Sequence, residues 1–163
     1  CSCYSTYRTS SGGTLSPEAA HTISVGSETL ALRLSKACHN AHTLATFLDT
    51  HPLVSQVYYP GLKEHPQHQL ASKLFKFNGG LLSFSLNEDI DLFAFLNRLK
   101  LVIKSSNLGD TRTLAIPVAH TIFFELGPER RAEMGIPDSM VRLSIGIEDT
   151  EDLLADFRQA LEN

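Results

Sequence analysis

The sequence predicts an α/β fold, a two-layer α+β sandwich in which a long N-terminal helix precedes a mixed or antiparallel sheet covered by helices. Apolar residues recur every three or four positions from Leu30 to Leu48, which is the spacing of one buried helix face. Short apolar runs then alternate with helical patterns. Residues 141–147 carry apolar side chains at every odd position, as expected of a strand with one buried face.

The N-terminal part is expected to contain a leader and the long helix. Residues 1–13 are mostly small and polar, so we predict an unstructured or non-homologous leader, followed by one domain over residues 14–163. Ser16-Pro17-Glu18 combines an N-cap residue, a proline at the first helical position and an acid in the first turn. The helix that begins there is expected to end near Asp49, and Gly26 predicts a bend, a close packing contact or a weak point within it.

The other elements follow from short patterns bounded by Gly, Pro and polar residues. Strands are expected at residues 54–59, 81–86, 101–104, 113–118 and 141–147. Helices are expected at residues 67–75 and 90–99, at 127–134 with Gly135 as the stop, and after Asp149 or Thr150.

The composition excludes several classes of protein. The net charge of −4 and the lack of a long basic run argue against nucleic acid as a partner. No stretch approaches the roughly 20 apolar residues of a membrane span, and we expect a soluble, cytoplasmic protein. Cys1, Cys3 and Cys38 are expected to be reduced thiols, because their number is odd and the first two are too close for a stabilising loop. Cys1 and Cys3 also lack a second Cys or His pair at zinc spacing.

The sequence contains no motif for metal binding or for several common kinds of catalysis. The sequence has no Gly-x-Ser-x-Gly elbow, no phosphate loop and no Gly-x-Gly-x-x-Gly after a strand. His39 with His42, and His65 with His68, would each be neighbours on a helix. Neither pair has a third ligand, so we predict solvated histidines and no metal site.

The clustered acids and the lysines are also better explained without a catalytic role. Asp149, Glu151 and Asp152 could serve acid/base chemistry or bind Ca²⁺, but acids are stabilised at a helix start, which favours capping. A cofactor aldehyde would require a lysine, and no lysine lies in a recognisable pocket motif.

Two places remain as candidate ligand sites, the loop of residues 105–110 and Arg142. Small hydroxyl and amide residues beside a glycine can present polar groups to a ligand. Arg142 shares the open face of its strand with Ser144 and Gly146, and its planar guanidinium suits a carboxylate. The alternative is a surface arginine paired with Asp or Glu.

Six short stretches carry a resemblance that covers residues 14–161. They are LSP at 15–17, ETLALR at 28–33, VYYPGL at 57–62, HPQH at 65–68, NLGD at 107–110 and VRLSIGIED at 141–149. In this order they resemble the C-terminal domain of the Cys/Met metabolism family of pyridoxal-phosphate enzymes. That family includes cystathionine gamma-synthase, cystathionine gamma-lyase, methionine gamma-lyase and the O-acylhomoserine sulfhydrylases.

The resemblance implies roles for particular residues. Arg142 is implied to bind the α-carboxylate of the substrate. Asn107 stands where many members carry Ser near the substrate, and its amide can orient a carboxylate but cannot act as a hydroxyl. Ile122 and Phe123 fall where a Thr-His pair is usual, which implies a reshaped substrate pocket. The implied lining of that pocket is Ser106, Leu108 and Ile122.

The resemblance also implies what this sequence lacks. The fold would be the small C-terminal domain of a fold-type I enzyme, with pyridoxal phosphate as the cofactor of the complete enzyme. The family's N-terminal domain supplies the lysine of the internal aldimine, an aspartate for the pyridine nitrogen and the phosphate grip. No Ser-x-Thr-Lys occurs in residues 1–163. We therefore assign no catalytic residue, and expect a chain that is inactive alone and requires the cofactor domain within a homo-oligomer.

The expected function is thus part of a lyase or transferase of sulfur amino-acid metabolism. The reaction would be a γ-elimination or γ-replacement on a homoserine ester, cystathionine or a methionine-like substrate. Two alternatives stay open: a regulatory module that binds an amino acid without transforming it, and an inactive unit for packing or dimerisation.

Overall fold

The computed structural model describes residues 12–162 and divides into two compact units, Cys1–Leu32 and Arg33–Asn163. In the first unit, α2 (Pro17–Glu28) begins as the sequence predicts: the Ser16 hydroxyl caps it by accepting a hydrogen bond from Ala19 N at 3.2 Å. This helix buries none of its side chains. Apolar side chains are exposed in this unit, among them Leu15, Ile23, Val25, Leu30 and Leu32.

The predicted long helix is two helices, with the interruption at Thr29. The Thr29 N–H bonds to the Ser27 carbonyl and ends α2, and α3 (Leu30–Asp49) begins at the next residue. Gly26 lies inside α2, and a Cβ added there would meet no described atom within 4 Å, so no neighbour among residues 12–162 provides the close packing contact suggested at this glycine. Only the second half of the predicted stripe is buried, at Ala41, Leu44 and Leu48. No helix within residues 12–162 is long and apolar enough to cross a membrane.

The second unit is built on a mixed sheet of five strands in the order β1-β2-β5-β4-β3. All neighbours are antiparallel except β3 and β4, which are parallel. The strands are β1 (Val54–Tyr58), β2 (Leu81–Leu86), β3 (Ile103–Lys104), β4 (Leu114–Pro117) and β5 (Met140–Ser144). Each lies within a predicted strand to within one residue, but β5 ends before Ile145, Gly146 and Ile147, which the sequence assigned to it.

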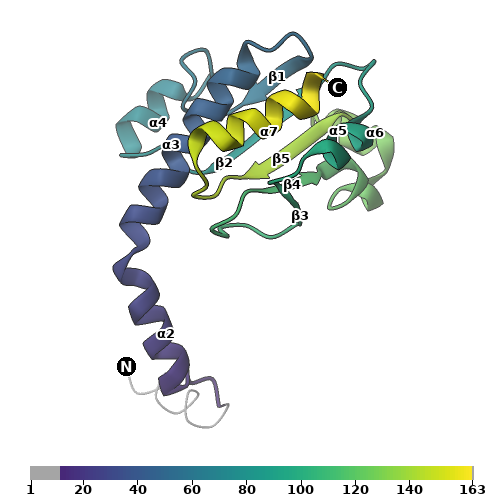
Figure 1. Ribbon diagram of the computed structural model, residues 1–163. Coiled ribbons are helices and arrows are strands. Elements are labelled where there is room, and N and C mark those ends of the chain that lie inside the picture. Colours follow the sequence, from purple (N-terminus) through teal and green to yellow (C-terminus); the bar gives the residue numbers. More distant parts are fainter. Residues whose placement is uncertain (1–11, 163) are drawn as a thin grey trace. The chain divides into compact units, whose positions relative to one another are not determined.

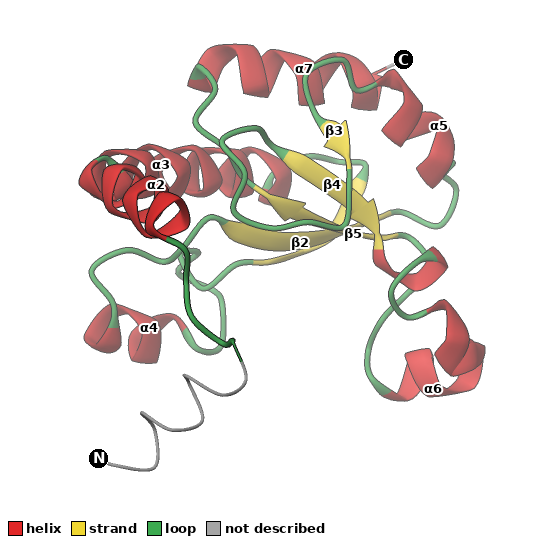
Figure 2. Ribbon diagram, turned by 90° about the horizontal axis from the view of Figure 1, so that it is seen from below, coloured by secondary structure: helices red, strands yellow, loops and turns green. Residues whose placement is uncertain are grey.

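Helices cover one face of this sheet and form the core there. Figures 1 and 2 show α5 and α7 lying along the sheet, with α3 on the same side. Phe84 of β2 is fully buried at the centre, with Phe95 of α5 and Phe157 of α7 edge-on to it at ring distances of 5.9 and 6.4 Å. The helices of the unit other than α3 are α4 (His68–Leu74), α5 (Leu92–Arg98), α6 (Gly127–Glu133) and α7 (Thr150–Glu162).

The opposite face carries a much smaller apolar cluster. Ile116, Val118 and Met140 form it, with Phe123 packed against them. These residues belong to β4, to the 3₁₀ turn η1 (Val118–His120) and to β5, and a second 3₁₀ turn, η2 (Phe124–Leu126), leads to α6. The sequence predicted neither 3₁₀ turn. Side chains alternate between the two faces of a strand, so the side chain that follows Met140 on this face of β5 is Arg142.

The buried aromatic cluster predicts where the fold is vulnerable. Phe84→Ala should lower the free energy of unfolding by about 3–5 kcal/mol, because the ring is fully enclosed and its loss leaves a cavity. Phe75→Ala is the matched control, since Phe75 is 61% exposed and should change stability by less than about 1 kcal/mol. Urea unfolding followed by circular dichroism measures both. Equal effects of the two substitutions would contradict this placement of the core.

Candidate functional site

Arg142 lies in the middle strand of the sheet, on the face opposite the helices. In register it stands beside Ser83 of β2 and Ile116 of β4. The side chain is half-buried, which corrects the expectation of a fully open face. Within the guanidinium, the Nε atom is buried.

The guanidinium of Arg142 has spare hydrogen-bonding capacity. Its Nη2 donates to the Ser106 carbonyl at 2.8 Å, whereas its buried Nε has no partner. Among residues 12–162 it forms no ion pair, so the alternative of a surface arginine paired with an acid does not describe this residue. A buried donor without an acceptor is costly.

The loop of residues 105–110 reaches the same face through its backbone. The Gly109 N–H donates to the Ser144 hydroxyl at 3.0 Å, and the Ser105 hydroxyl accepts from Asn107 N at 3.2 Å. Together with the bond from Arg142 to the Ser106 carbonyl, these contacts place the loop beside the guanidinium. Two of the sequence-predicted site residues, Ser106 and Arg142, are therefore in direct contact.

The remaining predicted site residues are not tied to Arg142 in the same way. The side chains of Asn107 and Leu108 are exposed, and the side-chain amide of Asn107 has no hydrogen bond within the described part of the chain. Ile122, 48% exposed, lies between the two 3₁₀ turns, and it is its neighbour Phe123 that packs on the small cluster. Ligand contacts for Asn107, Leu108 and Ile122 stay predictions.

Sequence reasoning missed a buried network at the end of β5. Thr113 is fully buried, and its backbone N–H and its hydroxyl both donate to the Glu148 carboxylate. Asn40, also fully buried, donates to the carbonyls of Gly146 and Glu148. Glu148 was visible within the stretch VRLSIGIED, but no periodicity or spacing relates it to Thr113 or Asn40.

Other residues that the sequence singled out have structural roles. The Asp149 carboxylate accepts from Glu151 N at 2.9 Å and from Asp152 N at 3.4 Å, so capping of α7 is confirmed. Cys38 is a buried free thiol whose pKa is raised by burial. Cys1 and Cys3 lie outside the described residues.

Three of the four paired histidines contact other residues. His65 Nδ1 accepts from Gln67 N, whereas His68 Nδ1 lies 2.9 Å from the Pro60 carbonyl. His42 stacks obliquely on Tyr59. Residues 12–162 contain no group of three His, Cys, Asp or Glu side chains arranged to hold a metal ion.

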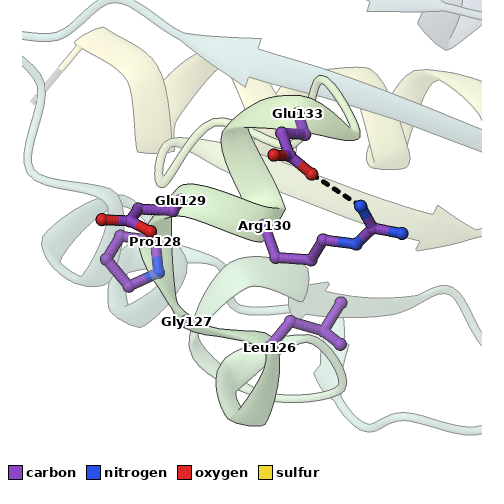
Figure 3. A pocket seen from close by; sticks show the side chains of 6 residues that line it. All are labelled: Leu126, Gly127, Pro128, Glu129, Arg130 and Glu133. Atoms are coloured by element: carbon purple, nitrogen blue, oxygen red, sulfur yellow. Dashed lines mark hydrogen bonds and ion pairs between the residues drawn. The ribbon is translucent and has the colours of Figure 1, made fainter.

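A hollow of about 370 Å³ at α6 lies apart from the predicted site residues, none of which lines it. Figure 3 shows Arg130 and Glu133 joined across one turn of α6, at 2.6 Å. The charge of Arg130 is thereby paired, and both side chains are exposed. The hollow offers no free cation to a carboxylate.

Comparison with known proteins decides the family. The family model for the Cys/Met metabolism PLP-dependent enzymes matches residues 3–162. The chain belongs to this family of pyridoxal-phosphate-dependent enzymes. The resemblance inferred from six short stretches is confirmed, whereas the leader boundary after residue 13 stays a prediction.

Relatives within the family cover almost the whole chain. Cystathionine gamma-lyase of Bacillus subtilis (strain 168) is 42% identical over 94% of the chain, and the match spans 41% of that protein. O-acetyl-L-homoserine sulfhydrylase 1 of Thermus thermophilus is 43% identical over 92% of the chain and 36% of its own length.

A solved structure shows the same fold at similar identity. Cystathionine gamma synthase from Xanthomonas oryzae pv. oryzae, in complex with cystathionine, superposes with a TM-score of 0.84 at 39% identity, over 91% of this chain and 39% of its own. The α/β fold predicted from the sequence is that of these family members. The chain spans about two fifths of the length of the two curated relatives just described.

The lysines of residues 12–162 are hydrogen-bonded to neighbouring side chains or exposed. Pyridoxal phosphate is held as a Schiff base on a lysine. Lys36 Nζ instead donates to the Thr150 hydroxyl at 2.8 Å, and Lys104 Nζ to the Asn97 amide oxygen at 2.7 Å. The other lysines of residues 12–162 are exposed on helices and turns. We assign no step of the cofactor's chemistry to these residues.

The loop beside Arg142 ends in an ion pair whose titration can be measured. Arg112 donates side-chain and backbone hydrogen bonds to Asp110 and lowers the pKa of that carboxyl to about 2. A lowered pKa in the folded state adds stability above the unfolded value near 4. That contribution is lost as the pH falls through about 2.

The Asp110 carboxyl carbon should therefore titrate with a midpoint near pH 2 in NMR spectra. Arg112→Gln should raise the midpoint toward the ordinary aspartate value, because the hydrogen bonds from the guanidinium and its charge are lost. Arg130→Gln, which removes an exposed arginine paired with Glu133, should leave it unchanged. An unshifted midpoint in the Arg112 variant would show that Arg112 does not lower the pKa of this carboxyl.

Proposed function

We propose that this chain provides the substrate-binding part of a pyridoxal-phosphate enzyme that eliminates or replaces a γ substituent on a sulfur amino acid or homoserine ester. The observation that carries the proposal is Arg142, a half-buried guanidinium with an unpartnered Nε and no acidic partner among the described residues. Relatives over more than nine tenths of the chain are cystathionine gamma-lyase, O-acetyl-L-homoserine sulfhydrylase and cystathionine gamma synthase.

Arg142 suits an α-carboxylate for electrostatic and geometric reasons. An arginine has five N–H donors in a plane, and only one of those of Arg142 donates to a described acceptor. Two of the others can meet the two oxygens of a carboxylate, a contact that fixes orientation as well as position. The bond to the Ser106 carbonyl restrains rotation of the guanidinium before the substrate arrives.

The bound cofactor supplies an electron sink for removing a proton from the substrate. Arg142 contributes by fixing one end of the amino acid, so that its reactive carbons stay in one orientation. We expect Asn107, which is exposed on the adjacent loop, to orient the same carboxylate through its amide. The lysine that binds the cofactor must come from outside the described residues, and we infer that residues 1–163 alone do not turn substrate over.

The assembly and location of the enzyme are part of the same proposal. We expect a homo-oligomer in the cytoplasm, with an amino acid as the small-molecule substrate. The Xanthomonas oryzae synthase, whose complex contains cystathionine, supports an amino acid of that size as ligand.

Substitution of Arg142 tests the proposal in the complete protein that carries this sequence. Arg142→Gln should raise the KM for cystathionine roughly thirtyfold, since charge-assisted hydrogen bonds worth about 2 kcal/mol are lost. Arg142→Lys should raise it about tenfold, because a point charge cannot make the planar two-point contact. Steady-state kinetics with cystathionine and with an O-acylhomoserine measure both.

Two controls distinguish carboxylate binding by Arg142 from the loss of any nearby positive charge and from activity of the isolated chain. Arg112→Gln removes a more exposed arginine from the neighbouring loop and should leave KM nearly unchanged. The residues 1–163 alone, mixed with pyridoxal phosphate, should show no turnover. An unchanged KM in Arg142→Gln would refute carboxylate binding. Amino-acid binding without turnover in the complete protein would instead favour a regulatory module.

A further inference from the structure

The loop beside Arg142 is followed by Thr113, whose hydroxyl and backbone N–H are hydrogen-bonded inside the protein. Thr113, fully buried, precedes β4. Its hydroxyl donates to Glu148 Oε2 at 2.8 Å and accepts from Gly146 N at 3.0 Å, while its backbone N–H donates to Glu148 Oε1. One carboxylate therefore holds both the main chain and the side chain at the end of the loop.

Glu148 is itself fixed from the helical side of the sheet. Its carbonyl accepts from Asn40 Nδ2 at 2.9 Å, and the same amide donates to the Gly146 carbonyl at 3.2 Å. The Asn40 side-chain oxygen, Oδ1, accepts from the Thr150 hydroxyl at 2.8 Å. Residues 146–150 are thus anchored to α3, and Thr113 is anchored to them.

The close approach of the loop to Gly146 depends on this anchor. A Cβ at Gly146 would collide with the backbone of Thr111 and Arg112, so the loop lies directly against the glycine. The Ile147 N–H donates to the Thr111 carbonyl at 2.8 Å. Nearer its start, the loop meets β5 through the Ser106 carbonyl and Gly109 N–H. Its two ends are therefore fixed to the chain segment that contains Arg142.

We propose that Thr113 and Glu148 are positioning residues that hold the loop of residues 105–112 against Arg142, and so preset the guanidinium for the substrate carboxylate. This inference rests on the proposed function. Neither side chain needs to touch the substrate. Their effect passes through the loop to the Ser106 carbonyl, which accepts the hydrogen bond from Arg142 Nη2. A loop released at Thr113 would leave the guanidinium free to turn away from the carboxylate.

Matched substitutions separate this role from simple structural support. Thr113→Val keeps the shape but removes the hydroxyl, leaving Gly146 N–H without an acceptor, and Glu148→Gln keeps the shape but removes the charge. Thr113→Ser keeps the hydroxyl and should behave as the native protein. Thr121→Val is the control, since it removes an exposed threonine hydroxyl that bonds locally to the Pro117 carbonyl.

Amide hydrogen exchange in the complete protein measures directly how firmly the loop of residues 105–112 is held. In Thr113→Val and Glu148→Gln, amides of residues 105–112 should exchange on the order of tenfold faster, while those of β2 stay protected. The KM for cystathionine should rise by about the same factor, with a smaller change in kcat. Thr113→Ser and Thr121→Val should leave both readouts close to native.

Other results of these measurements would contradict the positioning role. The proposed function is tested separately, by Arg142→Gln. Equal acceleration of exchange in β2 and the loop would show a general loss of stability and overturn the positioning role, as would unchanged loop exchange or an unchanged KM. Glu148→Gln keeps the test decisive if Thr113→Val does not fold. The proposed function fails instead if Arg142→Gln leaves the KM unchanged, whatever the loop does.

Discussion

Pairing of β5 on both of its edges is the constraint on which the rest of the structure depends. Because β2 and β4 flank this strand, a slip of one residue would turn Val141 and Leu143 away from the helices and drive Arg142 into the apolar core. Burial of an unpaired charge there would cost far more than the pairing energy of a short strand. The register that builds the core is therefore also the register that presents the guanidinium.

The two faces of the sheet have different roles. Three helices enclose one face, whereas the other carries only the small cluster around Ile116, Val118 and Met140. Ile116 of this cluster stands beside Arg142 in register, and polar contacts hold the neighbouring loop. Strand pairing and the tethered loop therefore hold Arg142, the proposed carboxylate ligand, from two directions.

Much of this architecture could be predicted from the sequence because its signals are local. Alternation specified β5, and the residues before α2 and α7 specified their caps. The break at Thr29 was missed because its residues have ordinary helix propensities, and Gly26 drew attention instead. The links of Thr113 and Asn40 with Glu148 join positions 35 and 108 residues apart, and no local pattern encodes such pairings. Arg142 was found through alternation and resemblance, whereas the residues that hold its loop needed three-dimensional contacts.

The contact between Gly146 and the loop also bears on how such a protein can change over evolutionary time. The Thr113 hydroxyl donates to the Glu148 carboxylate and accepts from the Gly146 N–H. Gly146 allows this contact because it has no side chain to collide with the loop. Loss of the Thr113 hydroxyl or of the Glu148 carboxylate would leave a buried group without its partner, and a side chain at Gly146 would collide with the loop, so single substitutions of these kinds are disfavoured even where a double or triple replacement would fit. Among related sequences, substitutions at these three positions should therefore tend to occur together.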